Sequence, residues 1–408
     1  MTGPNGGLTT VNRKQRHLSI SDPDVHFIDT TDDEPNPGQF EQFWEYSTGP
    51  SSPAPLQKSE STPNARGGSG MGGSGEPIAG VSDWECGNGR AYGRSTTLYE
   101  RHPHTGVPAG EPIADCFAIV ARQNSAILVL ADGVNWGHRA SLAARAAVHG
   151  CVNYLNQAVY TWNINTTTVD AFVALLRSFH AAHNLILEEQ GMLTTLTAVL
   201  VLPLVAHGRY IVCACNVGDS LAYVYSPNYG VREITEGSHD VNRMRDMRDA
   251  LGALGPVDGT NPELGNLTCA MTEVDPGDIV FLTSDGVSDN LDPVVGKFTG
   301  LGGVEAHQRH KLGLLRTEDL LKNGVSGSGP PCRSARDLVE LLVDFVTRLT
   351  AAKRHLLEDA DLYQPANVTA HRATRKRLCA KLAAVPGKLD HATVVAYTVG
   401  EMPSVPPP

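Results

Sequence analysis

The 408-residue sequence predicts an α+β fold in which antiparallel sheets are flanked by helices. Two observations support this class. The predicted strands come in runs, without the strict strand–helix alternation of a parallel sheet, and the predicted helices come in pairs between those runs. Hydrophobic residues make up 41% of the chain, which is enough for a proper core. The length allows roughly two or three domains, and one large domain with a tail fits equally well.

Short apolar runs indicate the strands. Two of these runs surround turn residues 122–125, and two others flank a predicted hairpin turn at 206–209. The predicted strands are Phe117–Ala121, Ile127–Ala131, Thr197–Leu204, Tyr210–Asn216, Leu221–Tyr225, Ile279–Thr283 and Ala392–Val399.

Alanine content and apolar spacing near 3.6 residues indicate three helices. Gly137–Leu155 is rich in alanine, whereas Ala171–Leu187 and Ser334–Leu349 each carry one apolar face. Residues 296–332 are rich in glycine, and we predict an irregular inserted loop there.

The two ends of the chain differ in composition from the middle. Residues 1–80 are rich in Gly, Pro, Ser, Thr and Asp, which predicts a disordered tail. The aromatic cluster Phe40, Phe43, Trp44 and Tyr46 is either a docking segment for a partner or a local patch without a role. Residues 81–400 are predicted to form the folded domain, and 401–408 a flexible C-terminus.

Charge and hydropathy exclude several classes of function. The formal net charge is −11, so nucleic acid and anionic membranes are not expected partners. The first thirty residues lack an apolar signal segment, and the longest apolar stretch, 192–206, is too short to span a bilayer. Eight cysteines without a CxxC pair indicate buried thiols. We expect a cytoplasmic protein, with a nuclear location left open. The basic stretch 371–378 is either a patch for localisation or for an acidic partner, or a solvated helix face.

Four aspartates lie at the ends of predicted strands. Asp132 and Asp285 follow apolar runs, whereas Asp115 and Asp390 precede them. Strand termini can bring distant carboxylates together, and clustered oxygen ligands are typical of Mg²⁺ or Mn²⁺ sites. The pattern therefore predicts a site for divalent metal ions, which is the setting that a two-metal phosphatase needs.

Six motifs in a fixed order make residues 83–400 resemble the metal-dependent serine/threonine protein phosphatases of the PPM (type 2C) family. Each motif alone is weak, because Asp-Gly pairs commonly form turns, but the ordered set is specific. The motifs are Ala-Asp-Gly (131–133), Thr-Thr-Leu-Thr-Ala-Val (194–199), Asn-Val-Gly-Asp-Ser (216–220), Ala-Leu-Gly (253–255), the segment 276–289 and Asp-His-Ala-Thr-Val-Val (390–395).

The resemblance implies a β-sandwich of two antiparallel sheets with helices on both outer faces, in α-β-β-α layers. It implies hydrolysis of phosphoserine and phosphothreonine in a phosphoprotein substrate by a metal-bridged water. Two Mg²⁺ or Mn²⁺ ions, with a weaker third site, would lie in a cleft at one end of the sandwich.

The resemblance also assigns roles to individual residues. Asp132 would bridge two ions and be catalytic, while Asp219 and Asp289 would hold the third, and Gly286 would let the chain turn away from Asp285. The implied metal ligands are Asp115, Asp132, Gly133 (through its carbonyl), Asp219, Asp285, Asp289 and Asp390.

The sequence departs from the family pattern at four places. Ala114 stands where members carry a glutamate, which leaves Asp115 as the only carboxylate of that pair. Val134 cannot donate a proton, so His138 is either the general acid or a surface histidine at a helix start. The usual Asp-Asn pair has His391 as its second residue.

The fourth departure concerns the arginine that grips the substrate phosphate. No arginine occurs at its usual place, so Arg101 is our candidate, with Arg94 as another. A solvated surface role fits Arg101 as well. These departures support an alternative hypothesis, in which the chain is a catalytically weak or inactive PPM-like scaffold that binds a partner.

Overall fold

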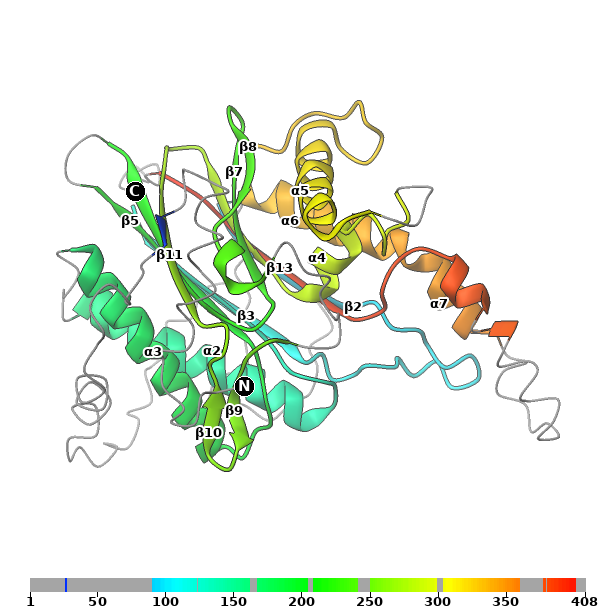
Figure 1. Ribbon diagram of the computed structural model, residues 1–408, viewed down its shortest axis with the longest axis horizontal. Helices are drawn as coiled ribbons and strands as arrows, with labels where there is room; N and C mark the ends of the chain where they lie inside the picture. Colours follow the sequence, from blue (N-terminus) through cyan, green and yellow to red (C-terminus); the bar gives the residue numbers. More distant parts are fainter. Residues whose placement is uncertain are drawn as a thin grey trace, which may run out of the picture.

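A computed structural model describes residues 26–27, 90–122, 124–161, 167–204, 208–240, 250–298, 304–359, 377–378 and 380–400. Two antiparallel sheets pack face to face and form the centre of the molecule (Figure 1). The first sheet has the order β1 (His26–Phe27), β11 (Thr268–Val274), β6 (Tyr210–Val217), β5 (Leu196–Pro203), β4 (Ala126–Asp132) and β3 (Asp115–Ala121). The second has the order β2 (Ala91–Thr97), β13 (His391–Thr398), β12 (Ile279–Thr283), β7 (Leu221–Ser226) and β8 (Gly230–Glu233).

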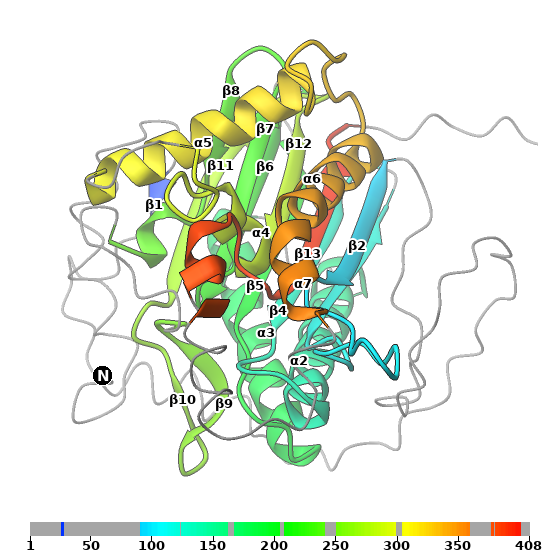
Figure 2. The same cartoon turned by 90° about the vertical axis from the view of Figure 1, so that its right-hand side faces the viewer.

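Helices cover the outer face of each sheet (Figures 1 and 2). Helices α2 (His138–Asn156) and α3 (Thr168–Glu188) pack on the first sheet. The second sheet is covered by α4 (Asp285–Leu291), α5 (Ala306–Asn323) and α6 (Ala335–Leu349), and α7 (Ala351–Leu357) follows α6. A small hairpin, β9 (Ala253–Asp258) and β10 (Asn261–Glu263), stands apart from both sheets. The predicted α-β-β-α layering is confirmed.

Three apolar clusters hold these layers together. One lies between the two sheets and includes Leu128, Val212 and Val280, all fully buried. The other two join each sheet to its helices. Strands β4, β5, β12 and β13 are buried on both faces, which is why their sequences are apolar runs without alternation.

The structure corrects the prediction for residues 296–332. Within 296–332, which we predicted to be irregular, residues Ala306–Asn323 form the 18-residue helix α5. Its start is fixed by a capping box between Glu305 and Gln308, and Leu320 and Leu321 are buried at its end. The many glycines of 296–332 led us to predict a loop in spite of these helix signals. One of them, Gly313, lies inside the helix.

Other predictions lie partly outside the described residues. These predictions concern the tail at 1–80 (apart from 26–27), the aromatic cluster at 40–46, residues 401–408 and most of the basic stretch 371–378. All six described cysteines are free thiols, and five of them are buried. None of the helices in the described ranges combines the length and the apolar composition that a membrane crossing needs.

Candidate metal and phosphate site

Asp115 and Asp132 face each other across two neighbouring strands at one end of the first sheet. The antiparallel register of β3 and β4 makes them direct partners. The Oδ2 atom of buried Asp115 accepts hydrogen bonds from Ser284 and Thr393, both at 2.7 Å and both belonging to the second sheet's side of the molecule. Its Oδ1 atom is buried without a hydrogen-bond partner among the described residues. Asp115 therefore joins the two sheets and keeps one oxygen available to a ligand.

Two threonines fix the backbone of Asp132. The carbonyl of Asp132 accepts from the Thr195 amide at 2.8 Å and from the Thr194 hydroxyl at 2.9 Å. Its own amide donates to the Thr195 hydroxyl at 3.0 Å. Next to it, a Cβ on Gly133 would lie 2.5 Å from the Ala140 carbonyl oxygen of α2, so no side chain fits there. The Thr-Thr and Asp-Gly motifs thus position one carboxylate.

Three further aspartates lie where β12 ends and β13 begins. Asp285 is the first residue of α4, which directly follows β12 and Ser284, and Asp289 is one turn further along the same helix. Asp390 immediately precedes β13, the strand that pairs with β12. The antiparallel pairing brings the end of one strand to the start of the other, and the three carboxylates meet there.

Gly286 does not have the role that we predicted for it. It lies inside α4 and is absent from the glycines with positive φ, so no turn depends on its freedom. A Cβ at this position would lie 1.7 Å from the backbone oxygen of His391. A glycine is required because α4 packs directly on the start of β13.

Gly286→Ala should therefore destabilise the fold by about 3 kcal/mol, because two backbone segments must separate. Gly313→Ala is the matched control, since its Cβ would meet only one atom, the Leu291 carbonyl oxygen at 3.8 Å, and alanine favours a helix by roughly 0.5–1 kcal/mol. Chemical denaturation of both variants tests the prediction. Equal stability of the two would contradict it.

Lys388, whose ammonium group lies among three of the carboxylates, was not predicted from the sequence. Its Nζ atom is 2.5 Å from Asp285 Oδ2, 2.8 Å from Asp289 Oδ2 and 3.0 Å from Asp390 Oδ2. Burial alone would lower the pKa of Lys388, but Asp289, Asp285 and Asp390 together raise it well above the ordinary lysine value. Lys388 is therefore a fixed positive charge inside the cluster.

The backbone around Lys388 is held as firmly as its side chain. The amide of Lys388 donates to Asn290 Oδ1 at 2.7 Å, and Asn290 Nδ2 donates to the Lys388 carbonyl at 3.0 Å. Asn290 belongs to α4 and is fully buried. The preceding Gly387 donates its amide to the Val295 carbonyl at 2.9 Å. These contacts build the lysine into the site.

Asp132 lies within electrostatic reach of the other carboxylates. Burial raises the pKa of Asp132 well above its ordinary value, and Asp115, Asp285, Asp390 and Asp219 raise it further. Burial likewise raises the pKa of Asp115 to about 6, against the opposing effects of His391 and two hydroxyl groups. Such repulsion between close carboxylates favours the binding of a cation or a proton.

Asp219 reaches the cluster from a tight turn between β6 and β7. Gly218, before it, has a φ of 105°, which suits glycine. Asn216 and Asn266 donate to the Gly218 carbonyl at 3.1 and 2.7 Å. The Asn-Val-Gly-Asp motif is thus a turn whose polar groups are satisfied and whose aspartate is buried.

Two aromatic residues line the Asp390 side. The Tyr99 hydroxyl donates to Asp390 Oδ1 at 3.2 Å, and the Tyr99 ring lies 6.2 Å from that of Trp136. His391 is buried; its Nδ1 accepts from the Ala114 amide at 3.4 Å, and its Nε2 donates to the Gly110 carbonyl. The residue in place of the usual asparagine thus fastens the 110–114 segment to β13.

His138 is the first residue of α2 and is exposed. Neither arginine candidate is directed at the cluster by a described contact. Arg101 is exposed and donates to the Gly106 carbonyl in its own loop at 3.4 Å. Arg94 pairs with Glu340 of α6. The phosphate-gripping role of Arg101 stays a prediction.

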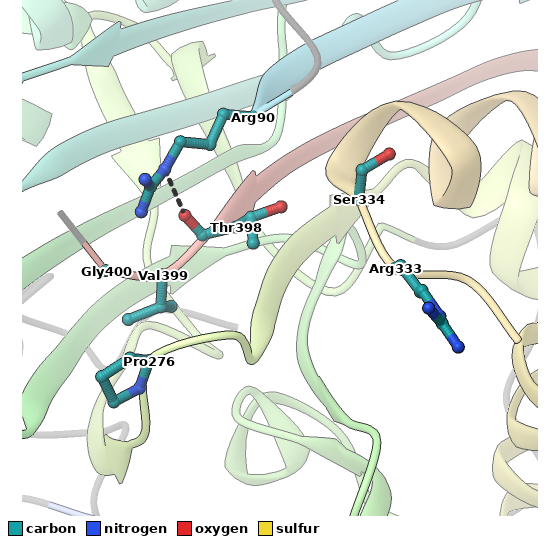
Figure 3. A pocket seen from close by; sticks show the side chains of 7 residues that line it. All are labelled: Arg90, Pro276, Arg333, Ser334, Thr398, Val399 and Gly400. Atoms are coloured by element: carbon teal, nitrogen blue, oxygen red, sulfur yellow. Dashed lines mark hydrogen bonds between the residues drawn. The ribbon is translucent and has the colours of Figure 1, made fainter. Parts of the chain in front are cut away.

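A shallow pocket lies at the other end of β13 (Figure 3). Its wall includes Arg90, whose Nε donates to the Thr398 carbonyl at 3.2 Å. Asp390 precedes β13, whereas Thr398 ends it, so this pocket is separate from the carboxylate cluster.

The residues present fit a hard cation on one side of the cluster. Among the described residues, none donates a hydrogen bond to the Asp132 carboxylate or forms an ion pair with it, Asp115 keeps a buried oxygen without a partner, and both groups have raised pKa values. On the other side, Asp285 and Asp390 each direct one oxygen to Lys388. Ala114 is fully buried and offers no ligand oxygen in its side chain. The charges favour a cation at Asp132, and Lys388 competes for the remaining carboxylates.

Comparison with known proteins agrees with this arrangement. Residues 106–301 match the family model for protein phosphatase 2C. The PP2C-like domain-containing protein CG9801 of Drosophila melanogaster is 43% identical over 437 residues, covering 79% of this chain. The chain spans 62% of the length of that relative.

The solved structures to which this chain is similar include two phosphatases. The Mycobacterium tuberculosis serine/threonine phosphatase PstP/Ppp shares 18% identity over 76% of this chain and 99% of its own, with a TM-score of 0.37. The photosystem II phosphatase PBCP shares 13% identity over 76% and 98%, with a TM-score of 0.40.

The layered fold, with aspartates gathered at one end of its two sheets, is the arrangement that the sequence resemblance implies. The match of residues 106–301 and the Drosophila relative support a divergent member of the PPM (type 2C) protein phosphatase family.

Proposed function

We propose that the chain is a protein phosphatase that hydrolyses phosphoserine and phosphothreonine monoesters of a phosphoprotein substrate with the help of divalent cations. The observation that supports this proposal is the convergence of Asp115, Asp219, Asp285 and Asp390 on Asp132, from separate segments of both sheets. Such a concentration of buried negative charge is costly to the fold, and a bound cation offsets the cost.

The cations that suit this oxygen-rich site are Mg²⁺ or Mn²⁺. Asp132, Asp115 and the Gly133 carbonyl would hold one ion. Asp285 and Asp390, once released from Lys388, would hold a second ion together with Asp132. Asp219 and Asp289 would hold a weaker third ion. When bound, such ions neutralise a phosphate and lower the pKa of a coordinated water.

The chain's own residues would position these groups. Thr194 and Thr195 hold the Asp132 backbone, and Ser284 and Thr393 orient the Asp115 carboxylate. Tyr99 orients Asp390 through its hydroxyl. Each of these hydrogen bonds restricts a carboxylate to one direction, which preorganises the site.

His138 would protonate the leaving oxygen of the substrate. His138→Gln should lower the turnover of a phosphothreonine peptide by about 100-fold. Turnover of p-nitrophenyl phosphate should change less than about threefold, because its leaving group departs without a proton. Side-by-side assays with the two substrates test this role. Equal losses on both would assign His138 to another role.

The direct test of the proposed function uses the full chain. After chelation and dialysis, the protein should hydrolyse phosphothreonine and phosphoserine peptides only when Mn²⁺ or Mg²⁺ is added back. A phosphotyrosine peptide of the same sequence controls for substrate class. Turnover that persists in the chelated protein, or no turnover at saturating Mn²⁺, would contradict the proposal.

Lys388 favours a second candidate, a weak or inactive phosphatase-like scaffold. Its ammonium already compensates Asp285, Asp289 and Asp390, so these residues satisfy their charges without an ion. A scaffold of this kind should bind a phosphopeptide without turning it over. Calorimetric binding to a phosphothreonine peptide, measured with the turnover assay, separates the two candidates.

A further inference from the structure

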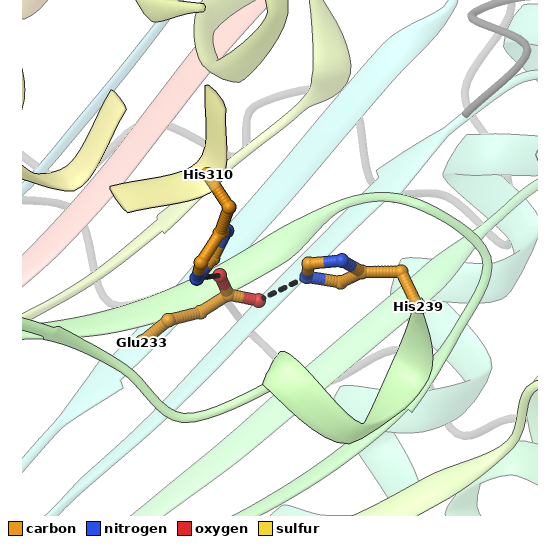
Figure 4. Close-up of side chains that lie close together, drawn as sticks. All are labelled: Glu233, His239 and His310. Carbon is orange, nitrogen blue, oxygen red and sulfur yellow. Dashed lines mark hydrogen bonds and ion pairs between the residues drawn. The ribbon is translucent and has the colours of Figure 1, made fainter. Parts of the chain in front are cut away.

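A second cluster of ligating side chains lies away from the aspartates, between β8, the loop that follows it and α5 (Figure 4). Glu233 ends β8, His239 follows the short helical turn Glu236–Ser238, and His310 lies in the second turn of α5. One ligand atom of each residue lies within 4.8 Å of the other two.

Each imidazole directs its Nε2 atom at the same carboxylate. His239 Nε2 is 2.8 Å from Glu233 Oε1, which also accepts from the Thr235 hydroxyl at 3.1 Å. His310 Nε2 is 3.6 Å from Glu233 Oε2. The Glu233 side chain is only 1% exposed, whereas the histidines are about one-fifth exposed at 18% and 20%. The group therefore consists of a buried carboxylate and two partly exposed histidines.

Hydrogen bonds pair Glu233 Oε1 with His239 Nε2 but leave two other polar atoms of the cluster without a partner among the described residues. Glu233 Oε2 and His310 Nε2 are both buried and have no hydrogen-bond partner among the described residues. A separation of 3.6 Å is too long for a hydrogen bond between them. Buried polar atoms of native proteins are rarely left without a partner, so two such atoms that face each other need an explanation.

A shared metal ion explains the separation. Zinc binds histidine nitrogen and carboxylate oxygen at about 2.0–2.2 Å, so two such ligands of a tetrahedral ion lie roughly 3.4 Å apart. Burial lowers the pKa of His310, which favours the neutral imidazole that metals bind. Imidazole nitrogens favour zinc and related transition metals over Mg²⁺.

We infer that Glu233, His239 and His310 form a binding site for a transition-metal ion of the zinc type, separate from the aspartate cluster. His239 exchanges its hydrogen bond with Glu233 for coordination when the ion binds. The ion joins α5 to β8, where the other described polar link is the 3.4 Å hydrogen bond from the Val231 amide to Glu318. The site therefore fixes the position of α5.

Zinc binding to the full chain tests this inference. Chelated protein is dialysed against a series of Zn²⁺ concentrations, and bound zinc is measured by elemental analysis. We expect Asp132→Asn to keep this zinc, whereas Glu233→Gln, His310→Ala and His239→Gln each lose at least about tenfold in affinity. His307→Ala is the matched control, because His307 is an exposed histidine of the same helix.

Measurements on the wild-type protein keep the inference testable if the Glu233 or His310 variants fail to fold. Zinc at about a hundred times its Kd should raise the Tm by roughly 5 °C. X-ray absorption of the zinc-loaded protein should show imidazole ligands. An all-oxygen shell, loss of zinc in Asp132→Asn alone, or no zinc binding would each overturn the inference.

Discussion

Asp132→Asn is expected to reduce Mn²⁺-dependent hydrolysis of a phosphothreonine peptide by roughly a thousandfold or more. Asp132 is the carboxylate on which Asp115, Asp219, Asp285 and Asp390 converge. A cation held there contributes several kcal/mol to the stabilisation of a phosphoryl transition state, and each 1.36 kcal/mol corresponds to a tenfold change in rate. The amide oxygen of asparagine carries no net charge and binds a hard cation weakly.

The same substitution should stabilise the chelated protein. Burial and four neighbouring carboxylates raise the pKa of Asp132, so its ionised form opposes folding at neutral pH. Removing the charge should increase the free energy of unfolding by about 1–2 kcal/mol. Activity loss with gained stability excludes misfolding as the cause. An Asp132→Asn protein with wild-type turnover would refute the assignment of Asp132.

Lys388→Met is expected to destabilise the chelated protein by about 3 kcal/mol, which corresponds to a fall in Tm of roughly 5–10 °C. The substitution leaves Asp285, Asp289 and Asp390 without their ammonium partner. Mn²⁺ should restore the lost stability, and its affinity should rise by at least about tenfold because a competing positive charge is gone. Thermal unfolding with and without Mn²⁺, and calorimetric titration, measure both effects.

Lys381→Met is the control for this experiment, because Lys381 is an exposed lysine close to Lys388 in the sequence. It should change the Tm by less than about 2 °C. If Lys388→Met matched the control in both Tm and Mn²⁺ affinity, the lysine would have no part in the charge balance of the site.

Much of the fold follows from local sequence. The strands β12 and β13 are mostly apolar because both faces are buried, and they were located within one residue. Strands β2, β8 and β11 escaped prediction because their burial is partial and their sequences mix polar and apolar residues. Helix α5 was missed because its exposed face and neighbouring glycines hide a short apolar stripe.

The carboxylates of the site could be proposed from sequence because each lies in a motif at the end of an apolar run. Lys388 has no such mark: it lies two residues before Asp390, in a segment without periodicity. Its position depends on Asn290, which is 98 residues away in sequence. The Glu233, His239 and His310 cluster depends in the same way on the packing of α5 against β8, which no local pattern reveals.

Anomalous scattering at the manganese edge from a Mn²⁺-soaked crystal shows whether Asp132 holds a cation. We expect a manganese ion bound by the Asp132 carboxylate, with Lys388 Nζ no longer in contact with all three of its aspartates. A crystal saturated with Mn²⁺ that shows no ion within coordination distance of Asp132, and Lys388 still holding Asp285, Asp289 and Asp390, would contradict this expectation.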